Sequence, residues 1–239
     1  MLADGIFAAV RPVSIFAFHT APLPVGSFGT RAGGLLPGRD RAQVTISGAG
    51  NLQEVAQAAI AAILGVGTVP AGAEFDPAPD DFVLAQVGPP RVESEDRWIV
   101  EGSITTASAA ARQRARQAID AAVAGVSRPG VEVTVRHLER AMAGVTNDSA
   151  LVAQGNASIR GVLGADAVVE IDQVLPAFSE DFGSFQEEVP GVMYFLGVDN
   201  AQRGTVGMPH SPDYVADEGA VLVGARAMIA VLLDQLAKR

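Results

Sequence analysis

The chain has 239 residues, enough for one large domain or two smaller ones, and 49% of them are hydrophobic, so we expect a globular protein with a substantial core. Its formal net charge of −10 argues against a nucleic-acid or an anionic-membrane partner, because both require clustered Lys and Arg. Without cysteine, it has neither disulfides nor thiolate metal ligands. No apolar run of about eighteen residues is evident, and the apolar N-terminus lacks the basic start of a signal peptide, so we predict a cytoplasmic protein without a membrane partner.

The first predicted element is a short strand at residues 14–18, which ends at His19. Residues 20–26 contain two prolines and a glycine, which break a strand. A histidine at a strand end most often has a structural role with a backbone partner, so this position alone does not assign a function to His19.

Residues 42–137 predict a small α+β domain. Apolar residues alternate with polar ones in its strands and recur at helical spacing in its helices. Ser108 and Gly125 are suited to begin and end the longer, alanine-rich helix. The predicted elements are a strand (42–47), a helix (52–64), two strands (81–87 and 97–105), a helix (108–126) and a strand (131–135). This β-α-β-β-α-β order is that of a ferredoxin-like unit.

Beyond residue 137 the pattern changes to helices alternating with apolar strands. Ser179 is a candidate N-cap, and Glu180 and Asp181 fall in the first turn of the helix that it begins. The predicted elements are a helix (148–163), a strand (167–171), a helix (179–188), a nearly all-apolar strand typical of the centre of a sheet (191–198) and a terminal helix (220–236). The spacing of this last helix rests on Val221, Ala225, Met228, Ile229, Leu232, Leu233 and Leu236.

These patterns predict one discontinuous α/β domain, residues 1–41 and 138–239, which is interrupted by the ferredoxin-like domain of residues 42–137. His19 and His210 are far apart in the sequence, yet both then belong to the α/β domain. Each follows a core strand, so we expect the two histidines at the strand ends of one domain.

Pro209 and Pro212 flank His210 and favour a rigid turn that aims the side chain. Imidazoles placed in this way suit a zinc-type site. A catalytic metal site, however, usually has three or more protein ligands and an open position for water, and two histidines alone do not supply it.

Other candidate residues have simpler explanations. His137 lies beside Arg136 and Arg140 at the end of a predicted strand, and we assign it no role. The serines lack a convincing histidine and acid arrangement, and no phosphate-binding loop of recognised spacing occurs. Helix capping or surface exposure explains most of the nearby carboxylates, which are Glu180, Asp181, Asp213, Asp217 and Glu218.

Several short motifs are more specific together than alone. They are FHTAPLPVG at 18–26, TND at 146–148, SEDF at 179–182, VPG at 189–191, FLG at 195–197, PHSP at 209–212 and ADE at 216–218. In order and spacing they resemble the aminoacylase and hippurate hydrolase group of metallopeptidase family 20, over nearly the whole chain.

The resemblance implies a zinc-peptidase-like α/β catalytic domain with an inserted ferredoxin-like lid, which commonly forms the dimer. By the same resemblance, His19 and His210 correspond to metal ligands, and Glu180 and Asp181 to supporting groups. The implied cofactor is a divalent metal: zinc, or manganese, cobalt or nickel. The implied reaction is hydrolysis of the amide of an N-acyl amino acid, in which metal ions polarise the carbonyl and activate water while a glutamate acts as general base.

The departures from the family pattern are equally informative. Family members begin with more than a hundred residues that carry further metal ligands and the glutamate base, and nothing equivalent precedes Met1. In the predicted lid, residues 47–51 lack the usual Gly-His segment, residues 88–91 lack an Asn-x-Ile-Pro motif, and Thr105 stands where arginine is usual. We therefore expect an incomplete α/β domain with no catalytic residue of its own, and either altered substrate recognition or none.

Two hypotheses remain. The chain is the C-terminal part of a hydrolase of small-molecule amides, completed by a separate or missing N-terminal polypeptide; or it is a non-catalytic dimerising or binding module derived from such a hydrolase, whose metal site need not be occupied. Under either hypothesis we predict a homodimer formed through residues 42–137 and no activity of the chain alone.

Overall fold

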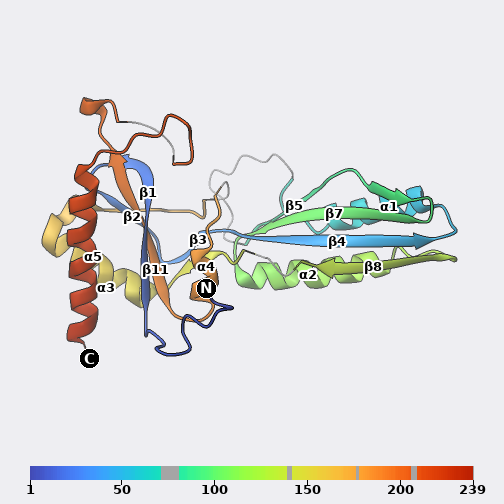
Figure 1. Ribbon diagram of the computed structural model, residues 1–239, viewed down its shortest axis with the longest axis horizontal. Coiled ribbons are helices and arrows are strands. Elements are labelled where there is room, and N and C mark those ends of the chain that lie inside the picture. Colours follow the sequence, from blue (N-terminus) through green and yellow to red (C-terminus); the bar gives the residue numbers. More distant parts are fainter. Residues whose placement is uncertain (71–80, 139–141, 176–177, 206–208, 239) are drawn as a thin grey trace. The chain divides into compact units, whose positions relative to one another are not determined.

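The computed structural model describes residues 1–70, 81–138, 142–175, 178–205 and 209–238 (Figure 1). These residues fall into two compact units. Unit 1 comprises Met1–Leu35, Thr146–Asp172 and Phe185–Arg239, and unit 2 comprises Leu36–Val145 and Gln173–Ser184. The expected boundaries lay at residues 41/42 and 137/138, and the segment 173–184, expected in the α/β domain, lies in unit 2.

Unit 1 is built on a four-stranded sheet with the strand order β1-β11-β2-β10. The strands are β1 (Ile15–Pro24), β2 (Phe28–Thr30), β10 (Val168–Glu170) and β11 (Gly191–Asp199). β11 lies between β1, to which it is parallel, and β2, to which it is antiparallel. Eight of its nine residues are buried, which confirms the interior strand that its apolar run predicted.

Strand β1 is longer than predicted. It continues through Pro22 and Pro24, so His19 lies inside the strand, paired with Phe195, and not at its end. Prolines are tolerated here because β1 is an edge strand, where a missing N–H removes no ladder hydrogen bond. The edge position depends on the tertiary fold and therefore left no local signal in the sequence.

Helices α3 (Ser149–Leu163) and α5 (Gly219–Ala237) pack on one face of this sheet. The Asp148 carboxylate caps α3 by accepting a hydrogen bond from the Leu151 N–H. Alternate residues of β11, including Tyr194 and Leu196, meet the two helices in the core. A short 3-10 helix, η1 (Ala165–Ala167), links α3 to β10.

Helix α5 is present as predicted, but the side that it buries is different. The buried residues are Ala220, Gly224, Ala227 and Val231. Most of the residues that defined the predicted spacing, among them Val221, Ile229, Leu232, Leu233 and Leu236, are exposed instead. Small residues allow a close approach to the sheet, since a Cβ at Gly224 would meet the Leu196 side chain at 3.0 Å.

The length of this apolar helix also corrects an expectation. By length and composition α5 is apolar enough to cross a membrane, with a mean hydropathy of 1.7. Arg226 and Asp234 are its only charged residues. These two charges interrupt the apolar run, which is why an uninterrupted stretch of about eighteen residues is not evident in the sequence.

Unit 2 contains an antiparallel sheet with the strand order β5-β7-β4-β8, and β6 pairs with β7. Its elements are β4 (Gly38–Gly48), α1 (Leu52–Leu64), β5 (Val83–Val87), β6 (Arg91–Ser94), β7 (Arg97–Thr106), α2 (Ala109–Ala124) and β8 (Val131–His137). The β-α-β-β-α-β order is the predicted one, with β6 added. Asn51 and Ser108 cap the two helices through their side chains.

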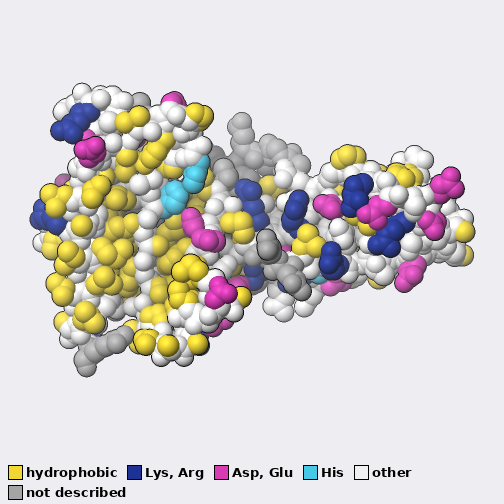
Figure 2. All heavy atoms as spheres, in the orientation of Figure 1, with side chains coloured by type: hydrophobic (Ala, Val, Ile, Leu, Met, Phe, Trp, Pro, Cys, Tyr) yellow, Lys and Arg dark blue, Asp and Glu magenta, His cyan; other side chains and the backbone are white. Residues whose placement is uncertain are grey.

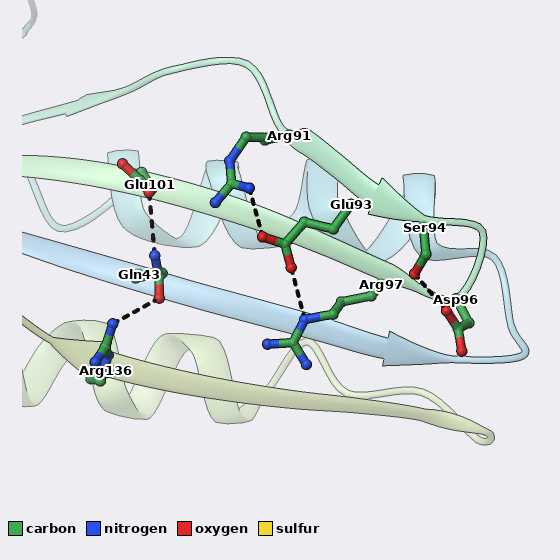
Figure 3. A network of polar contacts seen from close by, with 8 residues as sticks. All are labelled: Gln43, Arg91, Glu93, Ser94, Asp96, Arg97, Glu101 and Arg136. Carbon is green, nitrogen blue, oxygen red and sulfur yellow. Dashed lines mark hydrogen bonds and ion pairs between the residues drawn. The ribbon is translucent and has the colours of Figure 1, made fainter.

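The two faces of the unit 2 sheet differ. Ala42, Val44 and Ile46 alternate along β4 and pack with α1 and α2 in one core. On the other face, the Gln43 side chain donates to Glu101 and accepts from Arg136 across three strands (Figure 3). This second face is therefore polar and internally hydrogen-bonded.

Three short elements remain. β3 (Gly33–Leu36) and β9 (Val145–Asn147) pair as a two-stranded sheet where the chain leaves unit 1 and returns to it. α4 spans only Phe182–Gln186, so the predicted helix 179–188 is too long. The Asp181 N–H binds the Glu180 carboxylate, not a Ser179 cap, and residues 187–188 form a turn before Pro190.

Candidate metal site

The structure brings His19 and His210 together in unit 1. His19 projects from β1, and His210 lies in the loop between β11 and α5. Their ring centroids are 5.7 Å apart, with the ring planes inclined by 39°. Two histidine side chains lie next to each other on the visible surface of this unit (Figure 2). The sequence predicted a common domain for the two residues, and the structure makes them neighbours.

The backbone carbonyl of Thr20 selects the tautomer of the His19 ring. Nδ1 lies 2.7 Å from the Thr20 carbonyl oxygen, which can only accept a hydrogen bond. Nδ1 therefore carries the proton, and in the neutral ring Nε2 carries the lone pair. A ring N–H bound to a carbonyl is the usual arrangement of a metal-ligating histidine. Phe195 packs edge-on against the same ring, with centroids 6.2 Å apart, and limits its rotation.

His210 has a strained backbone. Its φ is +69°, and among the residues that the structure describes it is the only non-glycine residue with positive φ. A left-handed conformation costs a residue with a Cβ on the order of 1 kcal/mol. Such strain persists where the surrounding structure imposes it, and it is often found at functional sites. The geometry therefore agrees with a histidine that is aimed by its turn.

The loop that carries His210 is anchored by Asp217. This residue is buried, and its carboxylate accepts hydrogen bonds from Asn200 Nδ2 at 2.5 Å and from the Gly219 N–H at 2.7 Å. The pKa of Asp217 is held below its usual value, mainly by the hydrogen bond from Gly219 and then by the one from Asn200. The positive charge of Arg203, 3.6 Å away, lowers this pKa further. The bond to Gly219, the first residue of α5, agrees with the capping role that the sequence suggested, and the burial of Asp217 and its bond to Asn200 were not expected.

Two imidazoles at this separation fit one metal ion. An ion bound at about 2.1 Å from a ring nitrogen lies roughly 3.2 Å from the ring centroid, so centroids up to roughly 6.4 Å apart can share it. The observed 5.7 Å falls within this limit. In the part of the chain that the structure describes, no group of three or more His, Asp or Glu residues could hold a metal. The separation of the two rings therefore permits both to contact one ion, and the assignment of His19 and His210 as metal ligands stays a prediction.

Glu180 and Asp181, the predicted supporting groups, lie in unit 2. Burial, followed by the neighbouring Asp181 side chain, raises the pKa of Glu180. Asp181 is exposed. Their role at the metal site stays a prediction. His137, to which we assigned no role, contacts Asp120 at 2.7 Å within unit 2.

One structural residue near the site was missed by sequence reasoning. Asn147 is buried, and its Nδ2 donates to the hydroxyl of Thr30 and to the carbonyls of Arg31 and Met193, while its Oδ1 accepts from the Met193 N–H at 2.8 Å. It ties β2 to β11, the neighbour of the strand that carries His19. Asn147 belongs to the TND motif at residues 146–148, which indicated the family resemblance but did not predict these hydrogen bonds.

The chain belongs to peptidase family M20/M25/M40, whose family model matches residues 1–234. This confirms the resemblance noted in the sequence.

Two curated relatives are named as a hydrolase and a deacetylase of amino-acid derivatives. IAA-amino acid hydrolase ILR1-like 6 of Arabidopsis thaliana is 29% identical over 255 residues, which cover 97% of this chain and 51% of the relative. N-acetylcysteine deacetylase of Bacillus subtilis is 26% identical, covering 100% of this chain and 63% of the relative. The chain therefore spans between half and two thirds of the length of these relatives, and at the family level it is related to metal-dependent amide hydrolases.

Solved structures show the same fold. A putative aminohydrolase of Staphylococcus aureus aligns with a TM-score of 0.81 at 17% identity, covering 98% of this chain and 61% of that one. YXEP of Bacillus subtilis, described as a dinuclear metal binding peptidase, aligns with a TM-score of 0.71 at 22% identity, covering 98% and 60%. Both support the mixed α/β fold.

Proposed function

We propose that this chain is the metal-binding C-terminal part of an amide hydrolase that acts on N-acyl amino acids or related small amides. The observation that carries the proposal is the pair of histidine rings 5.7 Å apart, in a family whose relatives here include hydrolases of acylated amino acids. We further propose zinc as the metal, with manganese, cobalt or nickel as alternatives, since imidazole nitrogen suits such divalent ions.

The residues of this chain would position the metal. The Thr20 carbonyl keeps Nδ1 of His19 protonated and so presents Nε2, and Asp217 anchors the loop that presents His210. When bound, the ion would polarise the amide carbonyl and lower the pKa of a bound water. We assign the general base to polypeptide that lies outside this chain, and the two supporting roles to Glu180 and Asp181.

The alternative function is a non-catalytic dimerising or binding module. It is supported by the described residues, which offer two metal ligands, and by the departures at residues 47–51, 88–91 and 105. For both functions we propose a cytoplasmic protein that forms a homodimer through residues 42–137. Light scattering at high concentration tests the dimer, and a strictly monomeric species would contradict it.

Metal binding and turnover by the purified chain test the proposed function. We expect Zn²⁺ binding by calorimetry that falls about tenfold or more in His19→Ala and in His210→Ala, because each substitution removes one of two ligands. His137→Ala is the matched control and should bind normally. We expect no measurable hydrolysis of N-acetyl amino acids by the chain alone. Metal-dependent turnover that disappears in His210→Ala would show that the site is complete, and equal Zn²⁺ binding by all variants would refute the assigned ligands.

A further inference from the structure

The loop between β11 and α5, which carries His210, is joined at its two ends by side chains. Asn200 is the first residue after β11, and Asp217 lies two residues before α5 begins. The Asn200 Nδ2 donates to the Asp217 carboxylate at 2.5 Å, and the Asp217 N–H donates to the Val198 carbonyl at 2.9 Å. These two bonds close the loop at its base. We call the contact between Asn200 and Asp217 the loop clasp.

Asn200 is fixed on all sides by hydrogen bonds. Its backbone N–H donates to the carbonyl and to the hydroxyl of Thr205, both at 3.0 Å, and its carbonyl accepts from the N–H groups of Arg203 and Thr205. Its side-chain Oδ1 accepts from the Gln202 N–H at 3.2 Å. Because Oδ1 is held by this N–H, Nδ2 faces Asp217. The side-chain amide of Asn200 therefore has one orientation, which is the one that the loop clasp requires.

The middle of the loop has few other ties to the rest of unit 1. In the described residues 209–216, the hydrogen bonds stay inside the segment, as between Ser211 and Asp213. Tyr214 packs against the core of unit 1. His210 nevertheless keeps a φ of +69°, and a strained backbone persists only where the surrounding structure imposes it. The constraint on His210 must therefore come largely from the base of the loop.

We infer that Asn200 is a positioning residue for His210. Through Asp217 it closes the loop, and the closed loop keeps the His210 ring beside the His19 ring before any ion binds. The inference rests on the proposed function for the role of the two rings as ligands. Groups that orient metal ligands typically change metal affinity by about 10- to 100-fold. The apparent affinity falls with the fraction of molecules in which the two rings are together.

A capping role of Asn200 can be separated from its role in the clasp, because the two use different atoms. Oδ1 accepts from the Gln202 N–H at the start of the 3-10 helix η2 (Ala201–Arg203), whereas Nδ2 donates to Asp217. Asn200→Asp keeps an acceptor for the Gln202 N–H but removes the donor. It also places a second carboxylate against that of Asp217, and like charges at this distance repel. This substitution therefore breaks the clasp and leaves the cap.

Exchanging the two side chains tests the inference. In Asn200→Asp/Asp217→Asn the amide donates to the carboxylate in the opposite direction, and the amide oxygen at position 217 still accepts from the Gly219 N–H. In the metal-free protein, the nuclear Overhauser effect between the rings of His19 and His210 should disappear in Asn200→Asp and return in the double variant. The Zn²⁺ affinity, measured by calorimetry, should fall about tenfold or more in Asn200→Asp and recover to within about threefold in the double variant.

The matched control is Gln202→Glu, the same change of amide to acid on an exposed side chain two residues away, which should alter neither measurement. Circular dichroism verifies the fold of each variant. The inference is overturned if the wild-type rings show no contact, if a folded Asn200→Asp keeps the ring contact, or if the double variant does not restore it. Should Asn200→Asp fail to fold, the double variant alone decides. Loss and recovery of the ring contact without any Zn²⁺ binding would support the clasp and contradict the proposed function.

Discussion

Units 1 and 2 differ in the polarity of their outer surfaces. In unit 2, the sheet face turned away from α1 and α2 carries polar side chains that satisfy one another, as Gln43 does with Glu101 and Arg136 (Figure 3). In unit 1, the side of α5 turned away from the sheet is apolar along its length. A self-satisfied polar face is suited to water, whereas an apolar face costs free energy until it is covered. Unit 2 therefore satisfies its outer sheet face within itself, whereas unit 1 leaves an apolar helix face exposed.

The largest expected effect tests the independence of unit 2. Ile63→Ala should lower the free energy of unfolding of unit 2 by about 2–5 kcal/mol, because Ile63 is fully buried and leaves a cavity. Fluorescence of Trp98, the only tryptophan, which packs against the unit 2 core, follows this transition. Leu64→Ala, at the exposed neighbouring position, is the control and should have little effect. Equal loss of unit 1 structure in Ile63→Ala would contradict independent units.

A second substitution weakens unit 1 alone. Asn147→Ala leaves the buried Met193 N–H without its side-chain partner and removes one donor from the carbonyls of Arg31 and Met193, at a cost of about 3 kcal/mol. Hydrogen exchange of the β11 amides should accelerate, while the Trp98 transition keeps its midpoint. Thr146→Ala, next to it and exposed, should leave both unchanged. A shifted Trp98 midpoint in Asn147→Ala would show that the units unfold together.

The smallest expected effect concerns pH and the His210 loop. The folded-state pKa of Asp217 is below its ordinary value of 3.8, so its anchoring is fully present above that pH and is lost as the pH falls through the lowered value. Exchange of residues 209–218 should therefore accelerate below about pH 4. Asp217→Asn should remove this dependence, whereas Glu218→Gln should retain it. An unchanged profile in Asp217→Asn would mean that other groups hold the loop.

Elements with strong local signals were predictable from the sequence. Helix α1 begins and ends at the predicted residues, and Ser108 caps α2 as predicted, because capping is a short-range effect that a sequence displays directly. Helix α3 begins one residue later than predicted, and Asp148 is its cap. The β-α-β-β-α-β order was also predicted, although β6, a short and fully exposed strand, was missed for lack of an apolar pattern.

Features that depend on tertiary neighbours were not predictable. α5 is apolar almost all round, so periodicity could not show which side faces the sheet, and Gly224 rather than a large residue decided it. The extent of β1 depends on its edge position. A common domain for His19 and His210 was expected from the predicted fold, and their proximity is a finding of the structure. The burial of Asp217 and its bond to Asn200 follow from contacts that no spacing rule encodes.

The positive φ of His210 predicts which residue types suit this position of the turn. A turn that needs only a left-handed backbone is most stable with glycine, followed by asparagine. A chain that keeps this turn but no longer uses the side chain would relax toward those two residues. Here the residue is histidine, which is less stable in a left-handed backbone than either of them. A histidine at this position is what the proposed role as a metal ligand predicts, and glycine or asparagine there is what a loop that only turns predicts.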